Sequence, residues 1–343
     1  MKSIRYVLCL LFFFVVATTY VYSQSWDMFF DKGKELYNKG NYEKAIENLE
    51  LYLKYETTNP KAEAKHLLEH AKKRLIEQAE EELNFIENAL GLNMKMIYVE
   101  GGTFMMGAPD DDNEASSDEK PQHQVSLDSY YIAEFEITQS QWEKVMGTTI
   151  HQLNERYNNK WGAIIQGGSL PLIGIGEKYP MYFLDWVDAD AFCKKLSELT
   201  GKNYQLPTEA QWEFAARGGN KSKGYKYSGS NNIDEVAHYT KDWTLENSDF
   251  SKTHPVGQKR DNELGLYDMS GNVAEWCINW DEDYKAEKQT NPKGPVNGKY
   301  KVFRGGNIGN GGAKICRVTS RLATTTESWM AAAVGFRVVC IPD

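Results

Sequence analysis

The sequence predicts an α+β protein in which an irregular domain of helices and strands follows a small all-α region. Small and large apolar residues recur at helical spacing over residues 26–90, which is typical of amphipathic helices that pack together. From about Met94 the chain changes to short strand patterns, glycine turns and many aromatic residues, which is typical of a loop-rich mixed domain. A length of 343 residues allows both domains.

The composition is that of an acidic globular protein. The 39 Lys and Arg against 48 Asp and Glu give a formal net charge of -9, and 41% of the residues are hydrophobic. This hydrophobic fraction supports a packed core and excludes general disorder. Nucleic acid is not an expected partner, because its binding depends on a surplus of Lys and Arg that neutralises phosphates. Nucleotide binding is also not expected, because no glycine-rich phosphate loop follows a strand pattern.

Residues 1–23 are predicted to be a signal peptide. Two basic residues precede an apolar run over residues 6–21, and Val21 and Ser23 stand two apart at the expected cleavage site. A membrane anchor is the alternative, but the run is shorter than the ~20 residues that a span needs. Cys9 lies inside the run without a small residue before it, which argues against a lipoprotein. We therefore expect an exported protein that is periplasmic, surface-associated or secreted, with no later membrane span.

Residues 24–93 are predicted to form a helical region. Gly33, Gly40 and Ala45 stand where two helices would cross closely, and the pattern around them resembles one tetratricopeptide repeat, whose period is 34 residues. A charged amphipathic helix is expected over residues 61–90. One repeat buries its own faces poorly. We therefore expect the helices to dock on the next domain, on a protein partner or on a second copy. A helical spacer is the alternative.

The second region, residues 94–343, reads as short strands and capped helices. Strand patterns cover residues 96–99, 103–106 and 123–127. Capping boxes predict helices that begin at Thr138 and Thr208, and glycines that follow them predict where these helices end. A further amphipathic helix is expected over residues 188–199.

Four cysteines remain after signal cleavage: Cys193, Cys277, Cys316 and Cys340. An even number in an oxidising compartment suggests two disulfides. No pair is spaced as CxxC and no histidine lies near them in the sequence, so a structural zinc site is not expected.

Five stretches of the second region resemble motifs of the formylglycine-generating, or sulfatase-modifying factor, family. They occur in the family's order: YVEGGTFMMG at 98–107, LPTEAQWEFAARGG at 206–219, GLYDMSGNVAEW at 265–276, RGG at 304–306 and GFR at 335–337. The resemblance implies a variant of the C-type lectin fold. It also implies an activity that oxidises a sulfatase cysteine to formylglycine with oxygen and copper.

The residues that the resemblance implies for copper are incomplete. Cu(I) prefers thiolate ligands, and active relatives carry two cysteines shortly after the RGG motif. Asn310 stands in place of the first, and only Cys316 lies near the second. Asn307 replaces a serine of the family pattern, and Ala274 replaces a tryptophan of the family's cleft. We therefore expect neither copper nor an intact catalytic site, and we interpret Ala274, Asn307, Asn310 and Arg321 as the lining of a ligand pocket.

The resemblance further implies one structural calcium ion. Asp268, Gly271, Val273 and Glu275 match positions that hold calcium in the family. Two carboxylates and two backbone carbonyls are the hard oxygen ligands that calcium takes. The alternative is that both carboxylates only accept hydrogen bonds from backbone amides.

Relatives also carry a disulfide near two of the cysteines, which implies a Cys193–Cys340 bridge and leaves Cys277 with Cys316.

These residues favour a non-catalytic binding or scaffold module in the cell envelope. Its lectin-like cleft would take a protein or glycan ligand, and residues 26–90 would bind a protein partner. Two alternatives remain. One is an active formylglycine-generating oxidase. The other is a retroelement-diversified receptor with variable residues in the loops between Asn307 and Ala333.

Overall fold

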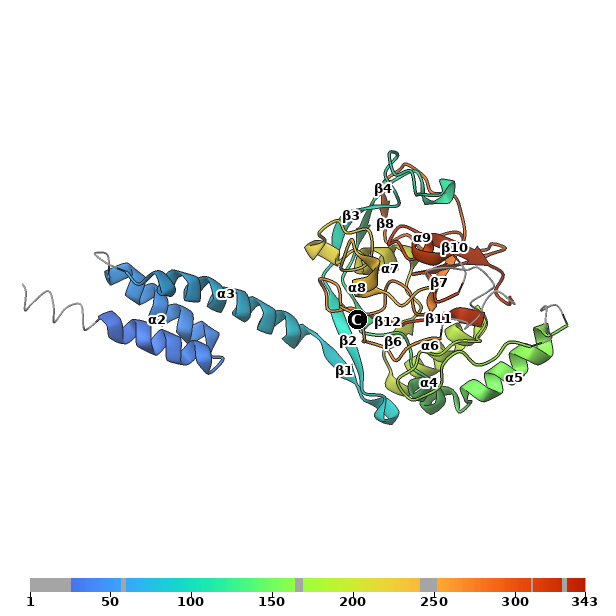
Figure 1. Cartoon of the computed structure of the whole chain (residues 1–343), viewed down its shortest axis with the longest axis horizontal. Coiled ribbons are helices and arrows are strands. Elements are labelled where there is room, and N and C mark those ends of the chain that lie inside the picture. The colour runs from blue at the N-terminus through green and yellow to red at the C-terminus, as the bar shows by residue number, and fades with distance from the viewer. Residues whose placement is uncertain are drawn as a thin grey trace, which may run out of the picture. The chain divides into compact units, whose positions relative to one another are not determined.

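The protein divides into two compact units, Met1–Leu83 and Asn84–Asp343, in a computed structural model that describes residues 26–56, 60–163, 169–240, 252–309, 311–328 and 332–342 (Figure 1). The predicted boundary at residue 93 is therefore too late. Residues 84–93 belong to the second unit because β1 (Phe85–Glu87) pairs antiparallel with β2 (Met94–Val99). The predicted signal peptide lies outside the described residues. Within the described ranges, no helix has both the length and the apolar character needed to cross a membrane.

The described residues of the first unit form three helices, in agreement with the helical region that the apolar spacing predicted. Residues 26–38 are helical, and α2 (Tyr42–Tyr55) and α3 (Ala62–Leu83) follow. A Cβ built on Gly33 would lie 2.8 Å from Leu49 Cγ, which confirms a close helix crossing at this glycine. Gly40 instead lies in the turn between helices with a φ of 74° and has open space around it. The predicted extension of the last helix to residue 90 is wrong, because α3 ends at Leu83.

The described residues of the second unit form three sheets. The five-stranded sheet has the order β1, β2, β5 (Tyr130–Ala133), β12 (Val339–Ile341) and β6 (Asn203–Gln205). The four-stranded sheet has the order β10 (Arg321–Thr324), β9 (Lys301–Arg304), β7 (Ala274–Trp280) and β11 (Val334–Gly335). The three-stranded sheet consists of β3 (Gly102–Met106), β4 (His123–Leu127) and β8 (Gln289–Thr290). The predicted strands at 96–99, 103–106 and 123–127 all exist.

Most helices of the second unit begin where local capping signals place them. The elements are α4 (Gln139–Met146), α5 (Ile150–Trp161), α6 (Trp186–Thr200), α7 (Glu209–Ala216), α8 (Ile233–Val236) and α9 (Gly312–Ile315), with 3₁₀ turns η1 (Ala89–Gly91), η2 (Ser117–Glu119) and η3 (Gly219–Lys221). Both predicted capping boxes are formed, at Thr138 and Thr208. Helix α5 was not predicted, although Thr149 and Gln152 form a capping box of the same spacing.

Helix α7 is buried on every face and contacts strands β3, β4, β7 and β9. It carries two carboxylates, Glu209 and Glu213, into this interior. In the sheet beside it, Glu275 of β7 lies opposite Arg304 of β9, and Arg304 lies opposite Arg321 of β10. The fold therefore brings charged residues from distant parts of the chain to one buried place.

Candidate functional site

Arg304 of the RGG motif neutralises both carboxylates of α7. Its Nη1 lies 3.0 Å from Glu209 Oε1 and its Nη2 lies 2.5 Å from Glu213 Oε2, with all three side chains buried. Buried charges persist in proteins when they are paired in this way. Burial alone would raise the pKa of Glu209, but the Arg321 and Arg304 guanidiniums hold it below its ordinary value.

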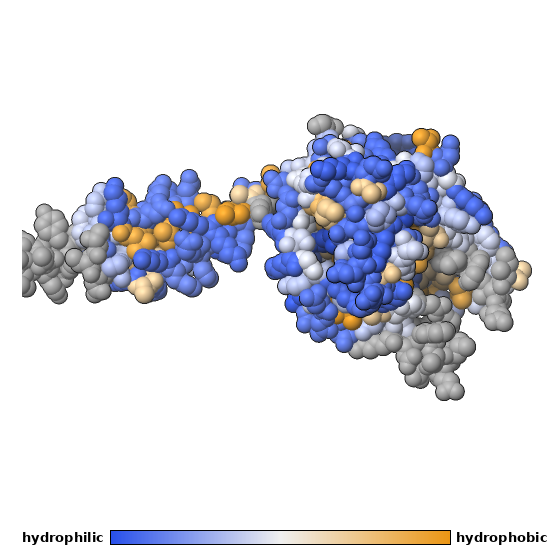
Figure 2. Space-filling view, turned by 90° about the horizontal axis from the view of Figure 1, so that it is seen from above, coloured by the Kyte–Doolittle hydropathy of each residue, from blue (hydrophilic) through white to orange (hydrophobic). Residues whose placement is uncertain are grey.

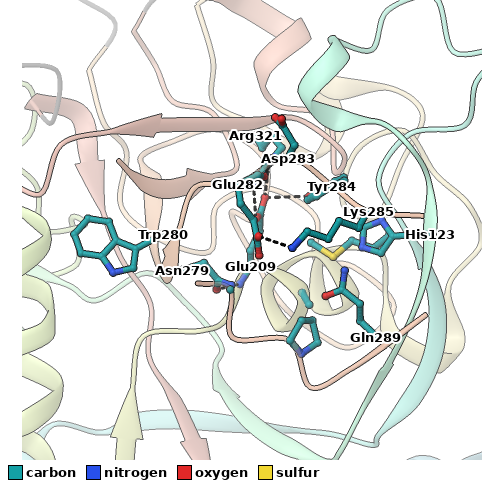
Figure 3. A pocket seen from close by; sticks show the side chains of 14 residues that line it. His123, Glu209, Asn279, Trp280, Glu282, Asp283, Tyr284, Lys285, Gln289 and Arg321 are labelled. Carbon is teal, nitrogen blue, oxygen red and sulfur yellow. Dashed lines mark hydrogen bonds and ion pairs between the residues drawn. The ribbon is translucent and has the colours of Figure 1, made fainter. Parts of the chain in front are cut away.

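Arg321 forms the second side of this cluster and lines a small pocket. Its Nε and Nη2 donate to the two oxygens of Glu209 at 2.8 and 2.9 Å, and its guanidinium lies 4.3 Å from the ring centre of Tyr284. Figure 3 shows these three side chains turned toward one another, with His123 and Lys285 on the same pocket. The pocket volume is about 30 Å³, which accommodates a water molecule or two but no organic ligand.

The predicted pocket residues do not all meet. Arg321 lines the small pocket, but Ala274 and Asn307 do not. Ala274 is fully buried and lies opposite Val334 in the β7–β11 pair, and Asn307 Oδ1 accepts the backbone N–H of Gly309 at 2.8 Å. Asn310 lies outside the described residues. Arg321 lies apart from Ala274 and Asn307 because it stands opposite Arg304 in the β9–β10 pair. From these two positions both arginines reach Glu209.

A larger cleft borders the loop that follows Asn307. Its volume is about 510 Å³, within the range of ordinary ligand pockets. We call it the histidine cleft; it is lined by Asp234, Ala237, His238, Tyr239, Lys252, His254, Lys259 and Ile308. Ile308 connects it to the Asn307 loop, because the backbone N–H of Ile308 donates to Asn272 and its carbonyl accepts the Thr240 hydroxyl.

Two stacked histidines form the centre of this cleft. The rings of His238 and His254 lie 3.7 Å apart between centroids, with planes 12° apart. Burial, followed by the neighbouring His254 and Lys259, lowers the pKa of His238 to about 4, and burial also lowers the pKa of His254. Both rings are therefore neutral at pH 7. The Nε2 atom of His238 is buried without a hydrogen-bond partner in the described part of the chain. The cleft thus offers imidazole hydrogen-bonding groups and lysines to a polar or acidic ligand.

Cys316 is the only cysteine of the sequence between the RGG and GFR motifs. It is fully buried, and burial raises the pKa of its thiol to about 12. Its Sγ donates to the carbonyl of Gly312 at 3.6 Å. Because the thiolate is the metal ligand and the nucleophile, a buried thiol with a raised pKa is inert.

Neither predicted disulfide is present. Cys193, Cys277 and Cys316 are free thiols, which excludes both the Cys193–Cys340 and the Cys277–Cys316 bridge in this structure. The second pairing fails for a geometric reason, since Cys277 packs in the core beside α7 and Cys316 packs in a separate cluster with Val236.

Asp268 occupies a strained position in the predicted calcium turn. Its φ is 57°, its Oδ2 accepts the backbone N–H of Gly257 at 2.7 Å, and its Oδ1 is buried without a hydrogen-bond partner among the described residues. Burial raises the pKa of Asp268 to about 6. Gly271 permits the turn, because a Cβ there would lie 2.3 Å from the carbonyl oxygen of His238. An orphaned carboxylate oxygen of this kind fits a hard cation such as calcium.

Glu275 is already neutralised by Arg337 of the GFR motif. Arg337 Nε and Nη2 donate to the two oxygens of Glu275 at 2.7 Å each, and Trp212 Nε1 also donates at 2.7 Å. A third carboxylate, Glu136, was not predicted; it accepts the backbone N–H of Val273 at 3.0 Å. Burial, followed by the charges of Asp268 and Glu275, raises the pKa of Glu136 well above its ordinary value.

No three His, Cys, Asp or Glu side chains in the described ranges are arranged to hold a metal ion. The predicted calcium ligand set also includes the backbone carbonyls of Gly271 and Val273; of its two carboxylates, Asp268 has an oxygen without a hydrogen-bond partner among the described residues, whereas both oxygens of Glu275 accept hydrogen bonds.

Residues 84–341 match the family described as the sulfatase-modifying factor enzyme 1-like domain. The chain belongs to this family. The match covers the whole second unit except its last residues and leaves out the helical unit. The predicted family and α+β fold class are therefore confirmed, with helices before the family domain.

Proteins with several different names are similar to this chain. The chaperone protein LppX of Paenibacillus barcinonensis is 32% identical over 256 residues, which cover 62% of this chain and 77% of LppX. The formylglycine-generating enzyme of Thermomonospora curvata is 28% identical over 298 residues, which cover 72% of this chain and 93% of the enzyme. The chain also matches Chlamydia protein kinases but spans only about a third of their length.

Among solved structures, Treponema denticola variable protein 1 is similar with a TM-score of 0.61 and 28% identity, over 76% of this chain and 99% of that protein.

Proposed function

We propose that this protein is a non-catalytic binding module of the sulfatase-modifying factor family, exported to the cell envelope as a receptor or scaffold. The observation that carries this proposal is that Cys316 is a single, buried thiol with a raised pKa. The sequence holds no second cysteine between the RGG and GFR motifs, and the one thiol there is buried with a pKa of about 12. A dithiolate copper site cannot be built from one inert thiol.

The histidine cleft is the proposed ligand site, for a protein or a glycan. Its volume and its polar lining suit a ligand, whereas the small pocket beside Arg321 is too narrow. Similarity to proteins named a chaperone and a variable protein supports a binding role. Residues 26–90 are proposed to bind a protein partner.

Two measurements test whether the protein lacks oxidase activity: Cu(I) binding in competition with a chelator, and conversion of a substrate peptide. We expect the purified protein neither to compete with a chelator for Cu(I) nor to convert a CxPxR peptide to the formylglycine form, because no thiolate pair is available. The Thermomonospora curvata enzyme is the positive control. Stoichiometric Cu(I) binding that is lost in Cys316→Ala, or any peptide conversion, would overturn the proposal.

The ligand role of the histidine cleft is tested by charge reversal. Lys259 lines the cleft and Lys285 lines the small pocket. Immobilised Lys259→Glu protein should lose a ligand from envelope extract that wild type and the control Lys285→Glu both retain. Equal retention by all three proteins would place the binding site elsewhere.

A structural calcium ion is also proposed, on the orphaned oxygen of Asp268. Calcium at 100 times its Kd should stabilise the fold by about 2.7 kcal/mol, and each kcal/mol raises the melting temperature by roughly 2–4 °C in a domain of this size. Melting curves in calcium and in EGTA measure the difference. Asp268→Ala should abolish the response, and Asp128→Ala, which changes an exposed carboxylate, should keep it. Identical wild-type curves in both buffers would exclude the site.

The diversified receptor remains the second candidate, favoured by the similarity to Treponema denticola variable protein 1. It predicts that residues between Asn307 and Ala333 differ among cells of one population, with a template repeat near the gene. Sequencing the locus in many isolates decides the question, because an invariant segment without a repeat excludes diversification.

A further inference from the structure

The histidine cleft carries an excess of positive charge. Two lysines, Lys252 and Lys259, line it against one carboxylate, that of Asp234, although the chain as a whole has a formal net charge of -9. A cleft lined mainly by one sign of charge concentrates ligands of the opposite sign. The lining therefore favours an anionic ligand.

The two lysines keep donors that the rest of the protein does not use. Lys259 Nζ donates to the backbone carbonyl of Asp234 at 2.8 Å, and the ammonium group has further N–H donors. The Asp234 carboxylate accepts the Tyr239 hydroxyl at 3.1 Å. Lys252 is exposed, and neither lysine forms an ion pair with another residue of the described ranges. Within these ranges, both ammonium groups are available to an anion from solution.

His254 adds an imidazole to the same side of the cleft. Its ring stacks on His238 with 3.7 Å between centroids, and its backbone N–H donates to Asn272 Oδ1 at 2.9 Å. The Nε2 atom of His238 is buried, whereas His254 is half-buried, so His254 is the ring that a ligand contacts first. Lys259 lies close to it, because its charge lowers the pKa of His254 after the larger effect of burial.

The size of the cleft suits a ring-sized group. Its volume of about 510 Å³ is typical of a pocket for a small ligand, whereas a specific protein interface covers about 800 Å² on each partner. Tyr239, Ala237 and Ile308 add aromatic and aliphatic surface to the lining. The visible face of the second unit is mostly hydrophilic in Figure 2, so broad apolar contact is not the expected mode of recognition. A sugar ring with a charged substituent matches this mixture of groups.

We propose that the histidine cleft binds an acidic sugar, with its anionic group held by Lys252, Lys259 and an N–H of the His254 ring and with its sugar ring against Tyr239. Carboxylate and phosphate substituents share this chemistry, because both accept charge-assisted hydrogen bonds from ammonium groups. His238 is a positioning residue that supports the His254 ring by stacking. The proposal rests on the proposed binding role of this cleft.

The test follows the histidine ring signals of the purified protein by NMR at constant pH and ionic strength. The probes are glucose, glucuronate and glucose 6-phosphate, which differ only at one carbon and separate a carboxylate from a phosphate. Glucuronate or glucose 6-phosphate should shift the His254 signals at a concentration roughly tenfold or more below that of glucose, as expected for one added charge-assisted contact. His254→Gln identifies the signals. His66 and His70, which are exposed on α3 of the other unit, should not respond.

Lys252→Gln with Lys259→Gln should weaken the acidic sugar roughly tenfold or more and leave glucose unchanged, because the substitutions remove charge and keep polar side chains. Lys293→Gln is the matched control, since Lys293 is exposed and lies outside the cleft lining; it should bind as wild type does. Thermal melting followed by circular dichroism confirms that each variant is folded. Three equal sugar responses, no response at the highest soluble concentrations, or N-acetylglutamate bound as tightly as the acidic sugar would each overturn the proposal.

The envelope-extract experiment with Lys259→Glu separates the two proposals. If that variant loses its ligand while neither acidic sugar binds wild type, the cleft binds a ligand of another class and only the acidic sugar is excluded. If the variant retains the ligand, the binding role of the cleft fails as well.

Discussion

Replacement of Arg337 by methionine should destabilise the second unit by about 3–5 kcal/mol. Arg337 is fully buried and makes two 2.7 Å bonds to Glu275. It also donates to the carbonyls of Ala133 and Tyr267 at 3.0 and 2.8 Å. The variant would leave the Glu275 carboxylate buried without its cation, and a buried unpaired charge is among the most destabilising changes in a protein.

The neighbours of Glu275 increase this cost. The carboxyl groups of Glu136 and Asp268 lie close enough for the charge of Glu275 to raise the pKa of each, after the larger effect of burial. The same cluster would lose its positive charge in Arg337→Met, so three neighbouring carboxyl groups would share the core without a cation.

Urea denaturation followed by tryptophan fluorescence measures the effect. Every tryptophan except Trp26 follows residue 84, so the signal reports the second unit. The double variant Arg337→Met with Glu275→Gln should recover part of the loss, since it removes the charge but keeps an acceptor for Trp212. Exposed Lys285→Met should change stability by less than about 0.5 kcal/mol. A loss below about 1 kcal/mol for Arg337→Met would show that Glu275 is neutralised by something other than Arg337.

Glu209→Gln should cost a similar amount, about 3–5 kcal/mol at neutral pH. Glu209 is the anion between two buried guanidiniums, those of Arg304 at 3.0 Å and Arg321 at 2.8 Å. Glutamine keeps the shape of the side chain but not its charge, so the two arginines would repel each other without a shared counter-ion. Glu282→Gln is the control, because the Glu282 side chain is 38% exposed and pairs only with exposed Lys285 among described residues.

The cost of Glu209→Gln should depend on pH. Arg321 and Arg304 hold the folded-state pKa of Glu209 below the value of 4.5 expected for an unfolded chain, against the opposing effect of burial. The carboxylate therefore stabilises the fold fully above that unfolded value, and its contribution is lost as the pH falls through the lower folded value. Urea curves of wild type and variant should converge on acidification. A difference that stays constant from pH 7 into the acid range would mean that the lost shape, not the lost charge, causes the effect.

The local pattern of the chain was enough to predict most elements. Thr138 and Thr208 begin helices because a capping box involves only four neighbouring residues. The strand at 123–127 is recovered because alternation along one strand is also local. The missed helix α5 carries the same local signal at Thr149 and was predictable.

The site could be predicted only in part. The motifs that contain Arg304 and Arg337 are visible in the sequence and indicate the family, but the partners of these arginines are not. Charged residues in an otherwise apolar helix, such as Glu209 and Glu213 in α7, signal that buried cations must reach them. That signal does not say which arginines do so.

The sequence by itself determined the family, the α+β class, the helical unit before the family domain and the single cysteine between the RGG and GFR motifs. Only the tertiary structure decided that Arg321 lies apart from the Asn307 loop, that Cys316 is buried and unbridged, and that the second unit begins at Asn84. The physical reason is distance along the chain. Capping and periodicity act between residues a few positions apart, whereas Arg321 meets Glu209 across 112 positions and Arg337 meets Glu275 across 62, through strand registers that no local pattern encodes.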